Sequence, residues 1–382
     1  PSGLVVPGIF TIVYSGLQGM KEKDHFSDLT SRSLGGSAPT RKKALELLQT
    51  PGEHLPALLW AAFRVRRKFW GTGVKLCVLQ NARSGLCPED CHYCSQSILS
   101  TAGIKKYGLL SRKELVAGAR KAVSAGARRY CMVTSGRGPG ERDLTHLAST
   151  VQEIKRRFPF LEICLSLGLM TERQAAQLKE AGVGWINHNL NTSRRFYPEI
   201  CSTHSYGDRV RTVQNVKRAG LSTCSGGIVG MGESDADFVE LAFSLRKLQV
   251  DSIPVNFLYP VEGTPLEDQP GFNPIRGLKA LCLMRFLNPS SEIRMAAGRE
   301  LYLGPAAGLA LYPANSIFVE GYLTTPGQSA HAARQLVEEA GFEVKSGDSN
   351  DKGVTGPDSS PTFPSLDSLR EFEDRRPVQS GD

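Results

Sequence analysis

The alternation of short apolar runs with helical patterns most strongly constrains the fold of this chain. Eight runs of apolar or alternating residues recur along it, and stretches with helical periodicity separate them. The runs lie near 75–80, 128–134, 161–167, 184–190, 221–229, 252–258, 291–297 and 315–319. Strands that alternate with helices predict a parallel sheet, since each crossover helix returns the chain to the same end of the sheet. Eight such units favour a closed (β/α)8 barrel of the TIM type over an open doubly wound sheet.

Helices are predicted between these strands and also before the first one. The patterns between and after the strands lie near 112–126, 144–157, 171–181, 205–219, 234–248, 274–287, 299–311 and 327–341. Before the first strand, Thr40 can cap a helix that runs to residue 47, because its side-chain oxygen can accept from a free backbone N–H. A second, basic helix spans roughly 54–70. We therefore expect an α/β fold with an N-terminal helical extension.

The two ends of the chain differ in composition from the middle. Residues 20–40 are polar and rich in Ser and Gly, and the end of the chain is rich in Ser, Asp, Pro and Gly. Such segments bury too little apolar surface to offset the entropy of ordering. Met20, followed by Lys-Glu-Lys-Asp, is the more natural beginning. We expect a disordered leader over 1–39, a barrel domain over 40–345 and a disordered tail over 346–382.

Charge and cysteine content exclude several classes of protein. The net charge is +8, but Lys and Arg are scattered over predicted helices rather than clustered in a stripe, so nucleic-acid binding is not expected. No run of about 18 apolar residues occurs, so no membrane span is expected. Nine cysteines, an odd number, argue against a disulfide framework and for metal chemistry in a reducing compartment, the cytoplasm.

Three of these cysteines, Cys87, Cys91 and Cys94, follow one another at C-x₃-C-x₂-C spacing in a run flanked by Gly and Pro. The flanking residues predict a loop, which can wrap three thiolates around one inorganic centre. Soft thiolates select iron–sulfur clusters or zinc. In a four-iron cluster, three cysteines leave one iron open to another ligand. The alternative is a zinc knuckle with His92 or a distant His as fourth ligand, although the sequence has no second C-x₂-C or H-x₃₋₅-H pair.

Polar side chains are predicted inside the barrel, because strand residues alternate between two faces. The faces opposite the apolar ones carry Cys131, Cys164, Cys224 and Arg294 on the second, third, fifth and seventh strands, and Asn187, Asn189 and Asn191 on the fourth. Burying such groups without partners costs roughly 1–3 kcal/mol each. We therefore interpret the interior as the site of a polar ligand and a second metal centre, which would give these groups partners. Taken singly, each cysteine is more often inert core, and Arg294 can simply pair with Glu292. We interpret Cys77, Cys201 and Cys282 as core or loop thiols and His188 as structural.

The cysteine spacing, with Tyr93 before the last cysteine, resembles the signature of radical S-adenosylmethionine (SAM) enzymes. The wider run of residues 81–96 is similar to the biotin synthase family. Further matching motifs lie at residues 130–132, 187–192, 224–233 and 294–300. The resemblance covers roughly residues 55–342, and together these motifs are specific.

The resemblance implies two clusters, SAM and a set of binding residues, with no catalytic residue beyond the clusters. Cys87, Cys91 and Cys94 would hold a 4Fe–4S cluster, and Cys131, Cys164, Cys224 and Arg294 would hold a 2Fe–2S cluster that supplies sulfur. For SAM, it implies Tyr93 beside the adenine, Asn189 and Asn191 at the ribose, Arg209 at the carboxylate, and Thr134 and Ser135 near the amino group. Asn256 would contact the ureido ring of dethiobiotin. The family often has Asp at the position of Asn191.

Each of these assignments has a plainer alternative. The asparagines can be polar groups at a strand end, Arg209 can be a surface arginine of a helix, and Tyr93 can pack the cluster loop. The implied reaction is sulfur insertion that converts dethiobiotin to biotin, with a flavodoxin-like electron donor and a homodimeric enzyme. Two other functions stay open: a related radical enzyme with another substrate, and a zinc-stabilised module that binds nucleic acid.

Overall fold

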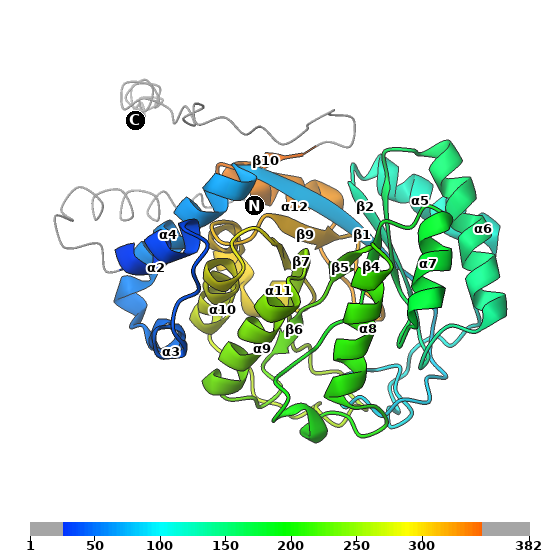
Figure 1. Cartoon of the computed structure of the whole chain (residues 1–382), viewed down its shortest axis with the longest axis horizontal. Helices are drawn as coiled ribbons and strands as arrows, with labels where there is room; N and C mark the ends of the chain where they lie inside the picture. The colour runs from blue at the N-terminus through cyan, green and yellow to red at the C-terminus, as the bar shows by residue number, and fades with distance from the viewer. Residues whose placement is uncertain (1–25, 346–382) are drawn as a thin grey trace, which may run out of the picture. The chain divides into compact units, whose positions relative to one another are not determined.

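Parallel strands occupy eight positions around a closed sheet in the computed structural model, which describes residues 26–345 (Figure 1). The strands are β1 (Gly73–Arg83), β2 (Arg129–Thr134), β3 (Glu162–Ser166), β4 (Trp185–Asn187), β5 (Ser222–Cys224), β6 (Gly227–Val229), β7 (Ser252–Phe257), β8 (Glu292–Met295), β9 (Ser316–Val319) and β10 (Glu343–Val344). They follow one another around the sheet in chain order, and β9 pairs with β1 to close it. β10 extends the sheet only at the start of β1. The predicted (β/α)8 barrel is confirmed.

The fifth position is shared by two short strands, where the sequence predicted one strand over 221–229. β5 pairs with β4 and β7, whereas β6 pairs with β7 alone among the named strands. At the interruption, a Cβ on Gly226 would lie 1.9 Å from the Pro254 carbonyl oxygen, so a larger residue does not fit. The Gly226 N–H donates to Asn189 Oδ1 at 3.1 Å. The break therefore turns a backbone donor toward the end of the neighbouring strand.

Helices cover the outside of the sheet (Figure 1). They are α5 (Arg112–Ser124), α6 (Glu141–Arg157), α7 (Glu172–Glu180), α8 (Tyr206–Arg218), α9 (Asp235–Leu248), α10 (Pro274–Leu287), α11 (Arg299–Tyr302) and α12 (Ala330–Glu339), with 3₁₀ turns at η2 (Tyr197–Glu199) and η3 (Gly304–Leu311). Capping boxes start α5, α7, α8 and α9. The single helix predicted over 299–311 is instead α11 followed by η3, and Pro305 stands at the start of η3.

From residue 26 onward, the N-terminal extension has three α-helices, one more than predicted. α3 (Arg41–Gln49) begins at the Thr40 cap, and α4 (Leu55–Trp70) follows η1 (Gly52–His54). α2 (Ser27–Leu34) lies within the stretch predicted to be disordered, so the prediction of a disordered leader over 1–39 is wrong for this segment. Phe26 and Leu29 are buried there, and Ser33 Oγ donates to the Phe286 carbonyl at 2.8 Å. Residues 1–25 and the tail predicted over 346–382 lie outside the described residues.

The molecule has two buried regions with different chemistry. Apolar residues fill the space between the sheet and its helices, including Ile163 and Leu165 of β3. A separate cluster inside the barrel contains Cys77, Cys131, Cys164, Ala296 and Phe318. The alternation predicted for β2 and β3 is thus confirmed.

Within residues 26–345, no helix has both the length and the apolar character that crossing a membrane requires.

Candidate active site

One cavity of about 350 Å³ runs from the carboxyl ends of the strands into the barrel. Every residue that the sequence singled out for a site lines it. These residues are Cys87, Cys91, Tyr93, Cys94, Cys131, Thr134, Ser135, Cys164, Asn189, Asn191, Arg209, Cys224, Asn256 and Arg294. Active sites of TIM-type barrels lie at this end, where the loops after the strands meet. The structure therefore brings all the candidates into one chamber, with the cysteine loop at its mouth.

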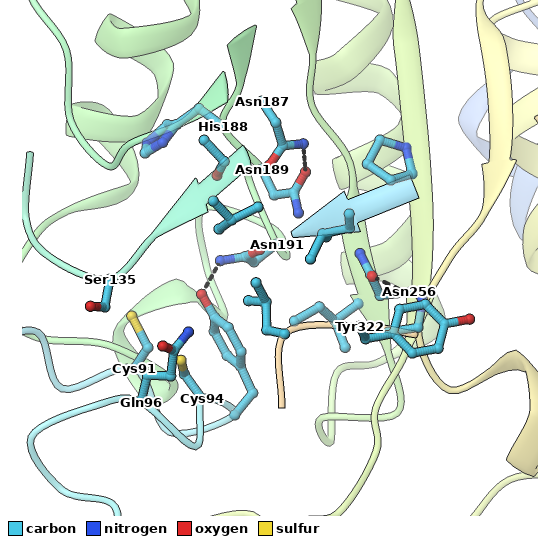
Figure 2. Close-up of a pocket in the computed structure, with 18 of the residues that line it drawn as sticks. Cys91, Cys94, Gln96, Ser135, Asn187, His188, Asn189, Asn191, Asn256 and Tyr322 are labelled. Atoms are coloured by element: carbon cyan, nitrogen blue, oxygen red, sulfur yellow. Dashed lines mark hydrogen bonds between the residues drawn. The ribbon is translucent and has the colours of Figure 1, made fainter. Parts of the chain in front are cut away.

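The cysteine loop follows β1 without regular secondary structure and is held by local hydrogen bonds. Gly85 and Leu86 both have positive φ, which turns the chain sharply before Cys87. Gln96 Oε1 accepts from the Gly85 N–H at 2.9 Å, which ties the two ends of the loop together. The Cys94 N–H donates to the Cys91 carbonyl at 3.1 Å. Figure 2 shows the Cys91 and Cys94 sulfurs close together on the same loop. His92, one zinc ligand considered from the sequence, is not among the residues that line the cavity.

Arg209 of α8 is buried and reaches the cysteine loop. It is only 8% exposed, so it is not a surface arginine. Its Nε donates to Tyr197 Oη, its Nη1 donates to the Asn189 carbonyl at 2.9 Å, and its Nη2 donates to Tyr93 Oη at 3.3 Å. The same Nη2 lies 4.0 Å from Cys91 Sγ. A fixed positive charge therefore stands beside the thiols at the cavity mouth.

The asparagines after β4 form a column between the loop and the interior (Figure 2). Asn187 Nδ2 donates to Asn189 Oδ1 at 3.1 Å, and Asn191 Nδ2 donates to Tyr93 Oη at 2.5 Å. Asn191 has a φ of +70°, a left-handed conformation that Asn tolerates better than most residues. Strand β4 ends at Asn187, earlier than predicted, so Asn189 and Asn191 present amide groups from irregular backbone.

Asn256, Ser135 and Thr134 lie at the ends of two other strands. Asn256 Nδ2 donates to the Gly227 carbonyl at 3.2 Å, and its Oδ1 accepts from the Ala297 N–H at 3.3 Å. Ser135 Oγ donates to the Gly85 carbonyl at 2.6 Å, so this side chain also supports the cysteine loop. Thr134 is the last residue of β2.

Deeper in the barrel, three thiols and one guanidinium converge. Cys131 and Cys164 are partners in the register of β2 and β3, and Arg294 Nη1 donates to Cys224 Sγ at 3.7 Å. A hydrogen bond from Cys164 lowers the pKa of the Cys224 thiol to about 5 against the effect of burial, and the charges of Arg294 and Arg129 add to the lowering. Thiolates are the metal-binding form of cysteine, so this environment suits a metal–sulfur centre.

A layer of charged groups closes the barrel beneath these thiols. Arg129 donates from both Nη atoms to the Glu292 carboxylate, at 3.0 and 3.1 Å, and Arg294 also pairs with Glu292. Lys75 Nζ lies 3.1 Å from the same carboxylate. Burial alone would raise the pKa of Glu292, but the charges of Arg129, Arg294 and Lys75 outweigh it and hold the pKa well below its usual range. The ion pair considered for Arg294 is thus present together with its contact to Cys224.

The three cysteines interpreted as core or loop thiols are all buried, but two of them have neighbours that the sequence did not indicate. Cys77 is core on the inner side of the barrel, with its Sγ 3.5 Å from Ser316 Oγ. Cys201 is a buried loop thiol, and its Sγ lies 3.8 Å from Cys91 Sγ. Strand alternation along β1 could have revealed Cys77, whereas Cys201 lies in irregular backbone where no periodicity applies. Cys282 is buried in α10, as expected. Tyr322 also lines the cavity, and nothing in the sequence pattern singled it out.

Comparison with known proteins agrees with this geometry. The profile described as the Radical SAM superfamily matches residues 83–245, and that of the Biotin and Thiamin Synthesis associated domain matches residues 254–343. The chain is 50% identical to "Biotin synthase 2" of Frankia casuarinae over 319 residues, which cover 84% of this chain and 89% of the relative. It is 49% identical to the biotin synthase of Geobacillus kaustophilus over 326 residues, or 85% of this chain and 98% of that one.

Solved structures share the fold at lower identity. The crystal structure of methylornithine synthase superposes with a TM-score of 0.73 at 21% identity, over 84% of this chain and 98% of that one. The hydrogenase maturase HydG from Carboxydothermus hydrogenoformans gives a TM-score of 0.70 at 17% identity, over 88% of this chain and 82% of that one. These likenesses support the barrel architecture alone.

Proposed function

Since this chain belongs to the biotin synthase family of radical SAM enzymes, we propose that it inserts sulfur into dethiobiotin to form biotin. The observation that carries the proposal is the single cavity that joins the three-cysteine loop at its mouth to the three thiols and Arg294 at its depth. One substrate in such a cavity faces both centres. The identity with biotin synthases also sets aside the zinc-stabilised nucleic-acid module considered from the sequence.

The residues present fit the two clusters that the proposal requires. Cys87, Cys91 and Cys94 would hold a 4Fe–4S cluster, since the loop offers soft donors and one iron would be left for SAM. Cys131, Cys164, Cys224 and Arg294 would hold a 2Fe–2S cluster in the buried cage. When bound, the first cluster and SAM supply hydrogen-atom abstraction from unactivated carbon, and the second cluster supplies sulfur.

The side chains between the centres would bind and orient SAM. Arg209 would pair with the SAM carboxylate, because its planar fork suits carboxylate geometry and its position is fixed by Tyr197 and the Asn189 carbonyl. Asn189 and Asn191 would bind the ribose hydroxyls, and Tyr93 would lie beside the adenine. Thr134 and Ser135 would lie near the SAM amino group at the end of β2.

Asn256 would contact the ureido ring of dethiobiotin, because an amide side chain offers both a donor and an acceptor. Its own hydrogen bonds to Gly227 and Ala297 fix its orientation at the cavity wall.

Below the thiols, the charged layer around Glu292 closes the barrel and helps to keep water from the interior. Exclusion of water suits radical chemistry, because it suppresses side reactions.

Two partners complete the proposal: a flavodoxin-like electron donor and a second copy of the chain. Leu86 and Ile98, on either side of the three cysteines, are 80% and 66% exposed. Exposed apolar groups beside the cluster loop offer a contact surface for the donor. The homodimer rests on family resemblance, and sedimentation of the purified protein tests it.

The direct test is biotin formation by protein reconstituted without air from iron, sulfide and SAM. We expect Cys87→Ala to lose activity, because it removes a cluster ligand, while Cys282→Ser stays active because this thiol is buried in α10 away from the cavity. Normal turnover by Cys87→Ala would refute the mechanism. Normal turnover by Cys164→Ala would instead favour a relative that acts on another substrate and needs no sulfur-supplying cluster.

A further inference from the structure

A second set of metal-binding side chains lies behind the three-cysteine loop. Cys91 Sγ is 3.8 Å from Cys201 Sγ, and Cys201 Sγ is 3.4 Å from Nδ1 and 3.8 Å from Nε2 of His204. One ligand atom from each of these residues lies within 4.8 Å of the others, and all three side chains are buried. Neither the sequence motifs nor the proposed reaction uses Cys201 or His204.

The segment that carries Cys201 and His204 is fixed to the cysteine loop. Asp90 accepts hydrogen bonds from the N–H groups of Ser202 and Thr203 at 3.0 and 3.1 Å. The His92 N–H donates to the Ile200 carbonyl at 3.0 Å. The Cys91–Cys201 pair is therefore held by a backbone hydrogen bond on one side and by the Asp90 carboxylate on the other, rather than by a chance approach of two flexible side chains.

The distances match those that a tetrahedral zinc ion imposes. With zinc–sulfur bonds of about 2.3 Å and zinc–nitrogen bonds of about 2.0–2.1 Å, tetrahedral angles place two sulfurs about 3.8 Å apart and a sulfur and a nitrogen about 3.6 Å apart. The Cys91 and Cys201 sulfurs are 3.8 Å apart, and the two nitrogens of His204 lie 3.4 and 3.8 Å from Cys201 Sγ. Cys201 therefore lies at zinc-compatible distances from both other residues, and the third pair, Cys91 and His204, lies within 4.8 Å.

The carboxylates around His204 complete the arrangement. Nδ1 of His204 is hydrogen-bonded to the buried Glu89, which leaves Nε2 as the nitrogen available to a metal. Zinc-binding histidines commonly donate their other ring N–H to a carboxylate in this way. Oδ1 of Asp90 lies 3.2 Å from Cys201 Sγ and offers a fourth donor. Two thiolates, one imidazole and one carboxylate form a donor set that zinc accepts.

We propose that the cluster-free chain binds one zinc ion between Cys91, Cys201 and His204. Cys91 also belongs to the three-cysteine set of the 4Fe–4S cluster, so zinc and the cluster exclude each other. The zinc ion then holds the loop folded before cluster assembly and must leave for assembly to begin. The zinc site stands on the geometry alone, whereas its competition with the cluster rests on the proposed function.

The zinc site is tested with the full-length, cluster-free protein kept without air. Zinc affinity is measured by competition with a chromophoric chelator, and the ligands are counted from the thiolate charge-transfer bands of the Co²⁺-substituted protein. We expect one ion per chain, an affinity loss of more than about 100-fold in Cys201→Ser and His204→Gln, and a loss of about 10–100-fold in Glu89→Gln. Cys94→Ser is the matched control, because it removes a cluster cysteine outside the set and should leave zinc affinity unchanged. Circular dichroism checks that each variant is folded.

Two outcomes would overturn the zinc site. Unchanged zinc affinity in folded Cys201→Ser and His204→Gln would refute it. A loss in Cys94→Ser as large as that in Cys201→Ser would also refute it, because Cys94 would then be a ligand and the donor set would be a different one.

The competition is tested separately by adding one equivalent of zinc before iron and sulfide. We expect zinc to slow the appearance of the cluster absorption in the unmodified chain and not in Cys201→Ser. Equal rates with and without zinc in the unmodified chain would overturn the competition. If no variant acquires a cluster under any condition, the proposed function and the competition both fail, while the zinc affinities still decide the site.

Discussion

Arg209 connects the cluster loop to the middle of the cavity through a single buried side chain. Its three nitrogens donate to Tyr197, Asn189 and Tyr93, which fixes the guanidinium plane before any ligand enters. A preorganised fork loses little entropy when it pairs with a carboxylate. We therefore expect Arg209 to contribute more to SAM binding than any one amide of the asparagine column.

Replacement of Arg209 by Lys should weaken SAM binding about 10–100-fold, because the lysine ammonium keeps the charge but cannot make the two parallel hydrogen bonds of a guanidinium. A hydrogen bond to a charged group contributes roughly 1.5–3 kcal/mol. Equilibrium binding of SAM to the reconstituted protein measures the change. Arg211→Lys on the same helix is the control, since that side chain is 67% exposed and pairs with Asp208. Wild-type SAM affinity in Arg209→Lys would contradict the assignment.

The sequence predicted which side chains meet in the cavity better than how they are held there. Strand alternation predicted that four side chains face the barrel interior, because a regular strand fixes the direction of every second side chain. These are Cys131, Cys164, Cys224 and Arg294. The partners that hold Arg209 were not predictable, since Tyr197 comes from a 3₁₀ turn and Asn189 from irregular backbone after β4.

At the scale of single elements, the predicted starts of α5, α7, α8 and α9 lie within one residue of the observed ones. Local capping boxes at Ser111, Thr171, Ser205 and Ser234 fix these starts in the structure. Helix α2 was missed, because its sequence is polar and its order comes from contact with residues far along the chain. Ser33 of α2, for example, donates to the Phe286 carbonyl of α10.

Leu29→Ala tests whether α2 is part of the folded domain. Leu29 is 6% exposed, and its truncation should lower the free energy of unfolding by about 2–3 kcal/mol through lost burial and a residual cavity. Urea unfolding followed by circular dichroism measures the change. Arg32→Ala on the exposed face of α2 should change it by less than about 0.5 kcal/mol. If Leu29→Ala and Arg32→Ala have the same free energy of unfolding, α2 contributes no packing energy and the result supports the expectation of disorder.

At the scale of the whole barrel, the interior is organised in layers along its axis. The cysteine loop lies at the mouth, amide groups lie below it, the thiols and Arg294 lie deeper, and Glu292 with Arg129 and Lys75 closes the floor. Three strands far apart in sequence supply the floor, which is why the sequence offered the Arg294–Glu292 pair within β8 but not the partners that Arg129 of β2 and Lys75 of β1 add.

Glu292→Gln should lower the free energy of unfolding by about 3–5 kcal/mol, because it leaves Arg294 buried without its counter-charge and leaves Arg129 with Glu162 as its acidic partner. Since the pKa of Glu292 is held low in the folded chain, its contribution is present above the pKa of an unfolded glutamate and is lost as the pH falls through the folded pKa. Urea unfolding at neutral pH gives the value, with Glu180→Gln on the exposed end of α7 as control. A change below about 1 kcal/mol would show that the floor adds little to stability.

The central claim is that one barrel holds both a SAM-binding cluster and a separate sulfur source. Mössbauer spectroscopy of iron-57 protein prepared without air, together with iron and sulfide analysis, tests it most directly. We expect a 4Fe–4S and a 2Fe–2S component in equal amounts per chain, loss of only the first in Cys87→Ala, and loss of only the second in Cys164→Ala. A colourless protein that takes up no iron, or a single component that both variants abolish, would contradict the claim.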